Sequence, residues 1–80
     1  MLYVYVLRSQ KFPDQIYTGG SADYRQRIAD HNLGHAKHTS KFAPWDVVCV
    51  IKFEDDKRGW QFEKYLKSGS GRAFVKRHFL

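Results

Sequence analysis

The sequence has a single cysteine and no long hydrophobic run. Cys49 stands alone among 80 residues, so an internal disulfide is excluded. It lies in the apolar run of residues 47–51, where we expect a buried and unreactive thiol. The longest apolar runs have about six residues, far short of the ~18 that a membrane-spanning helix needs, and no signal peptide is visible. We therefore expect a soluble protein of the cytoplasm with no membrane partner.

Zinc-type ligand pairs and a phosphate-binding glycine loop are also lacking. The four histidines and Cys49 show none of the paired spacings of a zinc site. The glycine-rich segment at residues 69–71 is short, and no Lys-Ser or Lys-Thr pair follows it. A nucleotide-binding loop of the P-loop type is therefore excluded.

Acidic residues are scarce at the C-terminal end. Residues 1–56 carry seven basic and seven acidic side chains, whereas residues 57–80 carry seven basic side chains and one acid, Glu63. The whole net charge of +6 therefore lies in the last 24 residues. Such an asymmetry favours a polyanionic partner, most simply nucleic acid, although a solubilising chain end would look the same. The candidate nucleic-acid-binding residues are His38, Lys67, Arg72, Lys76 and Arg77.

The length predicts one domain over residues 1–80, with a small core rich in aromatic side chains. The unbroken apolar run of residues 2–7 predicts a central strand that is buried on both faces. Residues 16–18 form a short second strand that ends at the glycine pair 19–20. The connection is too short to cross over to a parallel partner, so the two strands form a hairpin.

A helix is expected after this hairpin. Ser21 or Asp23 can cap its start, and Gly34 can close its end. Arg27 and His31 are one turn apart and share a side of the helix. The residues expected on its buried face are Ala22, Tyr24, Ile28 and Leu33.

The second half predicts a polar loop, a strand and two helices. The loop covers residues 35–45 and the strand residues 46–53. A helix over residues 58–66 turns Phe62 and Leu66 inward. The glycine-rich segment then breaks this helix, and Ser70 caps a last short helix. The order ββαβαα predicts an α+β fold, a three-stranded antiparallel sheet flanked by helices.

Five scattered residues could together hydrolyse a phosphodiester bond: Tyr5, Tyr17, Arg27, His31 and Glu63. A phenol or an imidazole can move a proton, and a guanidinium can hold a phosphate through two hydrogen bonds. A lone carboxylate can hold a divalent metal, because Mg²⁺ needs only one or two carboxylates beside water and substrate phosphate.

Each of these residues also has a purely structural interpretation. Strand tyrosines usually serve packing, and a histidine near a helix C-terminus favours the helix dipole. Arg27 could pair with Asp23 or Asp30 on the surface of its helix. Glu63 could pair with Lys67 one turn away, or lie opposite Lys64 in a solvated cluster. No single residue decides between the two interpretations.

Taken in order, these residues and their neighbours resemble the GIY-YIG nuclease superfamily. The string VYV at residues 4–6 stands where that family has its first motif, and YTG at residues 17–19 where it has its second. DYRQR at residues 23–27 is similar to the family's arginine-bearing helix. FEKYLK at residues 62–67 places Glu63 where the family has its metal-binding glutamate. The resemblance covers nearly the whole chain.

The stretch KSGSGR at residues 67–72 resembles the small stand-alone bacterial branch of the family. Two departures from the family pattern matter. Val4 and Thr18 replace the glycine-or-isoleucine character of the two signatures. Gly20 occupies a place where some members have a lysine beside the second tyrosine. If that lysine lowers a tyrosine pKa, this chain must use another cation or a metal-bound water, so the general base is left open.

The resemblance implies a divalent-metal-dependent endonuclease, with Mg²⁺ or Mn²⁺ held by Glu63. Arg27 would neutralise charge on the phosphoryl oxygens. Tyr17, or Tyr5 beside it, would position and deprotonate the attacking water. Nearby positive charge would have to lower the pKa of that phenol, because an unperturbed value near ~10 makes a poor base at neutral pH.

The expected partner is nucleic acid, DNA in the first place, with RNA and the form of the strand left open. His31 and His38 would contact phosphate or relay protons. No base-reading element and no obligate protein partner is visible, so affinity should be mostly electrostatic and weakly sequence-specific. The alternatives are a catalytically silent nucleic-acid-binding module of the same fold, and a protein-interaction domain with a basic face. Arg27 and Glu63 favour an enzyme over both.

Overall fold

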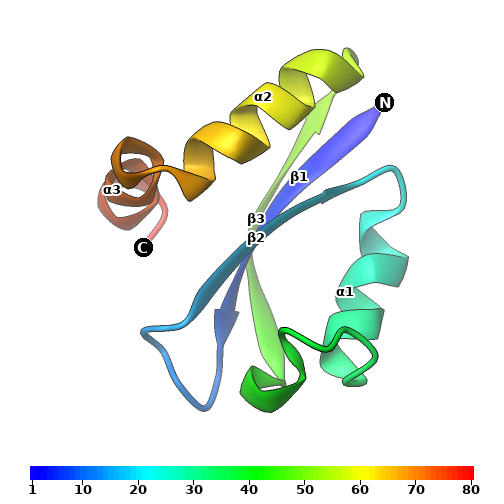
Figure 1. Cartoon of the computed structure of the whole chain (residues 1–80), viewed down its shortest axis with the longest axis vertical. Helices are drawn as coiled ribbons and strands as arrows, with labels where there is room; N and C mark the ends of the chain where they lie inside the picture. The colour runs from blue at the N-terminus through cyan, green and yellow to red at the C-terminus, as the bar shows by residue number, and fades with distance from the viewer.

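Strand β1 (Leu2–Ser9) lies at the centre of a three-stranded antiparallel sheet of order β2-β1-β3, as the sequence predicts (Figure 1). The computed structural model describes all of residues 1–80. It confirms the α+β fold and the ββαβαα order, with one added turn of 3₁₀ helix, η1, before the third strand. The other elements are β2 (Ile16–Ser21), α1 (Tyr24–Asn32), η1 (Ser40–Phe42), β3 (Trp45–Phe53), α2 (Asp56–Lys67) and α3 (Gly69–His78).

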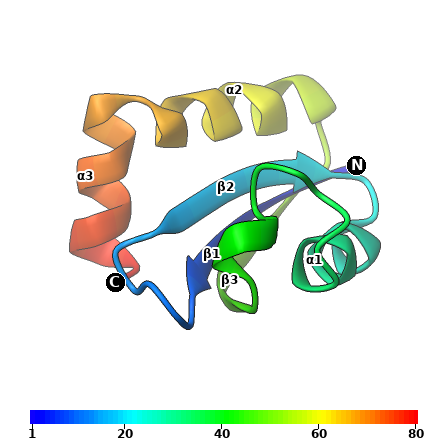
Figure 2. The same ribbon diagram turned by 60° about the horizontal axis from the view of Figure 1, so that its bottom comes forward.

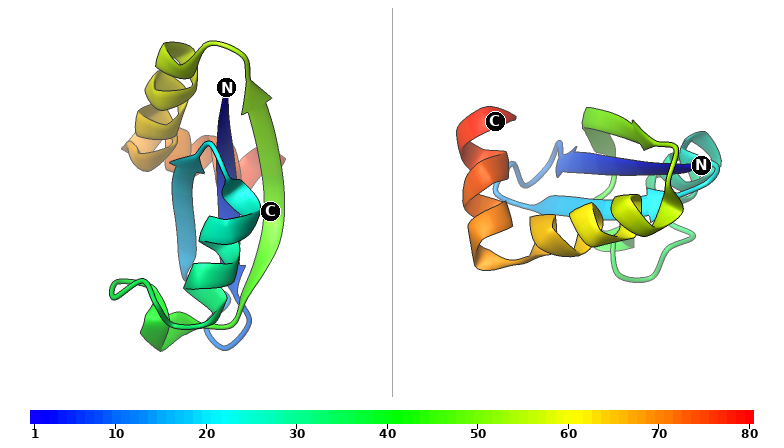
Figure 3. Two further views of the ribbon diagram at one scale, coloured as in Figure 1. Left: turned by 90° about the vertical axis from the view of Figure 1, so that its right-hand side faces the viewer. Right: turned by 90° about the horizontal axis from the view of Figure 1, so that it is seen from above.

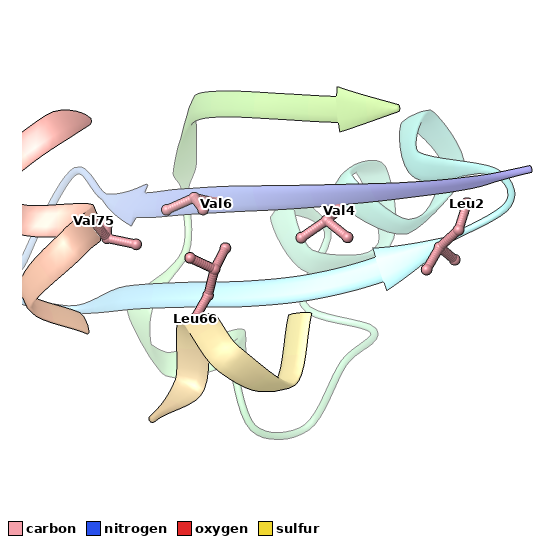
Figure 4. Packing of buried hydrophobic residues seen from close by; sticks show 5 residues of the cluster. All are labelled: Leu2, Val4, Val6, Leu66 and Val75. Atoms are coloured by element: carbon pink, nitrogen blue, oxygen red, sulfur yellow. The ribbon is translucent and has the colours of Figure 1, made fainter. Parts of the chain in front are cut away.

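Helices cover both faces of the sheet because β1 is apolar at every position along its middle. Leu2, Val4 and Val6 point to one face and pack against Leu66 of α2 and Val75 of α3 (Figure 4). This cluster forms the larger of two cores and fixes α2 and α3 on the sheet.

The opposite face of the sheet carries the second core. Tyr5 and Leu7 of β1 pack there with Trp45 at the start of β3. Tyr24 and Ile28 of α1 contact this cluster and are partly buried. Figure 3 shows α1 and α2 on different sides of the sheet. The side chains of successive β1 residues therefore reach two different surroundings.

Strand β2 is longer than predicted, because it continues through the glycine pair to Ser21. Gly19 pairs with Tyr5, and a Cβ at Gly19 would lie 2.5 Å from the Tyr5 hydroxyl oxygen. A Cβ at Gly20 would lie 2.9 Å from the ring of Trp60 in α2. The prediction that the glycines end the strand was wrong. They allow a tyrosine and a helix to approach the same edge strand from opposite sides.

Helix α1 begins after Asp23, whose carboxylate accepts a hydrogen bond from the backbone N–H of Gln26. Of the two predicted caps, Asp23 is therefore the one that is used. Gly34 follows the helix with a φ of +77°, which confirms the predicted closing glycine. Two of the four residues predicted on the buried face of the helix are exposed. Ala22 precedes the helix and is exposed, and the Leu33 side chain is 68% exposed.

Helices α2 and α3 meet at Ser68 rather than at the predicted glycine-rich break. The Ser68 hydroxyl accepts a hydrogen bond from the backbone N–H of Gly71, so Ser68, not Ser70, caps α3. The glycines form the first turn of the new helix. A Cβ at Gly71 would overlap the carbonyl oxygen of Tyr65 in α2, which explains the small residue at this close contact. Phe62 is half-buried against the core and Leu66 is fully buried, as predicted.

Cys49 is half-buried rather than fully buried, and burial raises the pKa of its thiol. An inert thiol therefore remains the better description. The helices are all too short or too polar to cross a bilayer.

Candidate active site

Tyr5 is almost completely buried, with only 1% of its surface exposed. Its ring lies over Gly19 of the neighbouring strand, on the sheet face that α1 covers. Its hydroxyl oxygen lies 3.2 Å from Nε2 of His31, which is equally buried at the end of α1. The hairpin and the first helix therefore bring together two residues that are 26 positions apart.

Thr39 is the second hydrogen-bond partner of His31. The Thr39 hydroxyl donates to the carbonyl oxygen of Ala36 at 3.3 Å and lies 2.7 Å from Nδ1 of His31. When the Thr39 proton lies on the Ala36 carbonyl, Thr39 accepts the second bond and the imidazole proton lies on Nδ1. Nε2 is then an acceptor, so the Tyr5 hydroxyl donates to it. The chain of donors runs from Tyr5 through His31 and Thr39 to Ala36.

The shifted pKa values of His31 and Tyr5 keep both groups uncharged near neutral pH. Burial, with the positive charge of Arg27 as a second cause, lowers the pKa of His31, so the ring is neutral near pH 7. Burial, followed by Tyr17 and to a lesser degree Glu63, raises the pKa of the Tyr5 phenol. A neutral imidazole and a protonated phenol are the forms that this hydrogen bond needs. The dipole interpretation of His31 does not apply, since a neutral ring carries no charge for it.

The raised pKa of Tyr5 bears on the general base. Deprotonation by Tyr5 would need a lowered pKa, and the Arg27 guanidinium does act in that direction by hydrogen bonding and by charge. Desolvation is the larger effect, so the net shift is upward. Tyr5 therefore stays protonated near neutral pH and is unsuited to accept a proton from water.

Tyr17 occupies the open side of the same cluster. Its ring centroid lies 4.7 Å from that of His31 and 6.4 Å from that of Tyr5. Unlike Tyr5, it is only half-buried. The ammonium of Lys67, which α2 brings in from the other side of β2, lies 5.9 Å from the Tyr17 ring centroid. Lys67 is thus a cation near the second tyrosine in a chain that has Gly20 instead of a neighbouring lysine.

Arg27 is exposed on α1 and forms no ion pair with Asp23 or Asp30. Asp30 instead lies 3.5 Å from His35. The alternative interpretation of Arg27, a surface pair with one of these acids, therefore does not hold. Its guanidinium acts by hydrogen bonding and charge on the pKa of Tyr5 and by charge on the pKa of His31, so it belongs to the same cluster.

Glu63 approaches the site from α2. Its carboxylate lies 2.8 Å from the ammonium of Lys67, so the structural pairing considered for it does occur. It is only 14% exposed, and its charge contributes to the raised pKa of Tyr5. Glu63 therefore borders the tyrosine cluster while it pairs with Lys67.

Glu63 offers a single carboxylate to a divalent ion. No group of three or more His, Cys, Asp or Glu side chains surrounds a common point, so no all-protein metal cage exists. A single carboxylate fits Mg²⁺ or Mn²⁺ when water and a substrate phosphate complete the coordination shell. Glu63 is the one side chain at the site that suits this role.

The predicted nucleic-acid-binding residues divide into two groups. Lys67, Arg72 and Lys76 line a cleft of about 780 Å³ between the β1–β2 hairpin and helices α2 and α3. His38 and Arg77 are exposed but lie outside this cleft.

Sequence reasoning missed Thr39 and Arg8. Thr39 holds His31, but it lies in a polar loop with no periodic pattern to single it out. Arg8 lines the cleft with the C-terminal cations, although it belongs to the half of the chain in which charges balance. Its only signal is alternation along β1, which gives it the same face as Val6.

A family model for the GIY-YIG catalytic domain matches residues 1–77. The chain belongs to the GIY-YIG family. The strings that resemble the two motifs of this family lie on β1, which carries Tyr5, and on β2, which carries Tyr17. No solved structure gives a significant match to the chain.

Curated relatives of this GIY-YIG chain are of two kinds. A UPF0213 protein of Natronomonas pharaonis is 33% identical over 67 residues, which cover 82% of this chain and 76% of the relative. A protein named structure-specific endonuclease subunit slx1 in Talaromyces stipitatus is 35% identical over 65 residues, covering 74% of this chain and 17% of the relative. A homologue of that subunit in Caenorhabditis briggsae is 36% identical over 56 residues, covering 62% of this chain and 13% of the relative. The chain thus spans less than a fifth of the length of these endonuclease subunits.

Proposed function

We propose that this chain is a divalent-metal-dependent endonuclease that hydrolyses phosphodiester bonds in nucleic acid, DNA in the first place. The observation that carries the proposal is the meeting of Tyr5, Tyr17, Arg27, His31 and Glu63 around one point of the sheet in a GIY-YIG domain. The longer relatives are named as endonuclease subunits, which supports the same activity.

The roles follow from exposure and charge. Arg27 is exposed and unpaired, so it holds the scissile phosphate and neutralises charge that develops on its oxygens. Tyr17 is the accessible phenol, so it positions the attacking water and takes its proton. Tyr5 and His31 form a buried pair that keeps Tyr17 in place. The oxygen of the water bonds to phosphorus as the bond from phosphorus to the 3′ oxygen breaks.

Glu63 is the residue that would hold Mg²⁺ or Mn²⁺, which when bound supplies a Lewis acid for the phosphate and the leaving 3′ oxygen. Lys67 is its present partner, at 2.8 Å. An incoming cation must therefore compete with the Lys67 ammonium for the carboxylate. We expect cleavage to need a divalent ion well above trace amounts.

The same ion pair favours a second candidate function. If Lys67 keeps Glu63 neutralised at all times, the fold would bind nucleic acid through its cations and cut nothing. This catalytically silent module predicts the same basic surface and no metal requirement.

One experiment separates the two. Labelled duplex, branched and single-stranded DNA, and matching RNA, are incubated with the protein in Mg²⁺, in Mn²⁺ or in chelator. Endonuclease activity predicts products in metal and none in chelator. Binding without cleavage on every substrate would reject the enzyme and favour the silent module.

A further inference from the structure

The cleft beside the tyrosine site carries an excess of unpaired positive charge. Asp14 is the one acidic residue in its lining. The cationic residues in the lining are Arg8, Lys67, Arg72 and Lys76. The ion pairs of the structure join Met1 to Asp56, His35 to Asp30 and Lys67 to Glu63, so three of the four cleft cations have no acidic partner.

These cations come from both walls of the cleft. Arg8 ends β1, and its Nε donates to the carbonyl oxygen of Pro13 in the hairpin turn at 3.0 Å, which leaves the outer guanidinium nitrogens free. Arg72 and Lys76 are one turn apart on α3. Figure 2 shows the end of α3 close to the β1–β2 turn. A chain of phosphates lying between the walls would meet positive charge on either side.

Part of the cleft lining is apolar, and we call this part its floor. It includes Ile16, Leu66, Val75 and Leu80. Leu66 and Val75 are themselves buried, so Ile16 and the 48% exposed Leu80 present most of its surface. Phosphates alone would gain nothing from such a floor, whereas the face of an unstacked base would be buried against it. In an intact duplex the base faces are stacked inside and cannot reach it.

The cleft is continuous with the proposed catalytic site, because Tyr17 and Lys67 belong to both. Its volume of about 780 Å³ is in the range of ~300–1,000 Å³ that holds a small-molecule ligand, so it suits a few nucleotide units rather than a double helix.

We infer that this cleft binds an unpaired segment of a DNA strand, with phosphates on the Arg8, Arg72 and Lys76 walls and a base on the apolar floor. The inference rests on the proposed function, because it makes the bound segment the continuation of the strand whose phosphodiester lies at Tyr17. The substrate is then DNA with a single-stranded portion next to the cleavage point.

The test measures binding in chelator, so that no cleavage interferes. The probes are a fluorescent single-stranded DNA hexamer, a blunt hairpin duplex that contains the same sequence, and the RNA hexamer. The cleft variant is Arg72→Gln with Lys76→Gln. Its matched control is Lys57→Gln with Arg58→Gln, which removes the same charge from the exposed start of α2, outside the cleft. Thermal melting verifies that both variants fold.

We expect the cleft variant to weaken binding of the DNA hexamer on the order of tenfold. The slope of log affinity against log salt concentration should shrink by roughly 1.4, because each of two lost single-strand phosphate contacts contributes about 0.7. The control pair should change hexamer affinity less than about twofold. Leu80→Gln, which changes no charge, should also weaken the hexamer and leave the duplex unaffected.

The inference would be overturned if the cleft and control variants weakened hexamer binding equally. It would also be overturned if the cleft variant weakened duplex binding as much as hexamer binding. Binding of the RNA hexamer alone would overturn the assignment to DNA. A parent protein that binds the hexamer through the cleft but cuts nothing supports this inference and rejects the proposed nuclease. A parent that cuts, with a cleft variant that binds and cuts equally well, rejects this inference alone.

Discussion

The ammonium of Lys67 lies 2.8 Å from the carboxylate of Glu63, one helical turn earlier in α2. Lys67 is 49% exposed, and a partly exposed i, i+4 pair of this kind is worth only ~0.3–0.5 kcal/mol. Such a pair is weak enough for a divalent cation to replace it. The pair therefore decides little about folding and leaves the Glu63 charge available for function.

Glu63→Gln keeps the size and hydrogen bonding of the side chain and removes its charge. We expect cleavage to fall by ~100-fold or more, because the only carboxylate able to hold the metal is lost. Stability should change by at most ~0.5 kcal/mol. Cleavage rate against Mg²⁺ concentration checks this, with melting as the folding test. Glu54→Gln removes an equal charge from an exposed residue before α2 and serves as the matched control. A folded Glu63→Gln protein that cuts like the parent would reject the metal assignment.

Thr39→Val keeps the shape of the residue and removes the hydroxyl that accepts from Nδ1 of His31. The imidazole then loses the bond that fixes its proton, and the Tyr5 hydroxyl loses a dedicated acceptor. We expect a mixture of tautomers in ¹⁵N NMR spectra of the His31 ring, and cleavage lower by ~10-fold to 100-fold.

Ser40→Ala is the control for this change, since it removes a hydroxyl from the next residue that bonds only to the Lys37 carbonyl. Unchanged ring-nitrogen signals in Thr39→Val would show that the tautomer is set elsewhere.

His31 should make stability depend on pH in the weakly acid range. Burial lowers its pKa in the folded state below the ordinary value of 6.5, so between these two values the unfolded chain binds more protons. The free energy of unfolding therefore falls as the pH drops below about 6.5 and continues to fall until the folded pKa is reached. Urea unfolding at a series of pH values from neutral to weakly acid measures the slope.

His31→Gln should remove this component of the slope, whereas His38→Gln, at an exposed histidine of the same region, should keep it. The prediction fails if the two variants and the parent show the same pH dependence.

Gly19→Ala should disturb the site without any change in polar groups. The new Cβ would lie 2.5 Å from the Tyr5 hydroxyl oxygen, so the ring must move and its bond to His31 must lengthen. We expect a loss of ~1–3 kcal/mol in the free energy of unfolding, as for other overpacked cores, together with weaker cleavage.

Gly69→Ala is the matched control. No atom lies within 4 Å of its added Cβ, and the position is the first of α3. Because alanine restricts the unfolded chain, this change should raise stability by ~0.4–1 kcal/mol. Melting curves of both variants test the pair, and a Gly19→Ala protein as stable and active as the parent would refute the close packing of Tyr5 on β2.

Local patterns predicted the fold well where they were unbroken. The apolar run of β1 predicted a central strand, and the short connection after it predicted the antiparallel hairpin. Gly34 was recognised as the residue that closes α1 because a left-handed backbone favours glycine. The same reasoning failed at the other glycines. Gly19 and Gly71 have no special backbone role, and each is small because a distant segment packs against it.

The candidate site was predicted in part. The order of motifs singled out both tyrosines, Arg27, His31 and Glu63, and the structure brings their side chains or charges to Tyr5 and Tyr17. Thr39 could not be found in this way, because its role depends on how the loop after α1 folds back onto His31. The direction of the Tyr5 pKa was also out of reach, since it depends on how completely the phenol is desolvated.

The sequence by itself determined the central position of β1, the hairpin, the helix order and the concentration of positive charge near the C-terminus. These follow from contacts between near neighbours and from composition. The tertiary structure decided that Tyr5 meets His31, that Lys67 lies close to both Glu63 and Tyr17, and that Arg8 joins the cations of α3 around one cleft. Such relations depend on burial and on distances between segments far apart in the chain, which only the packing of α1, α2 and α3 against the sheet establishes.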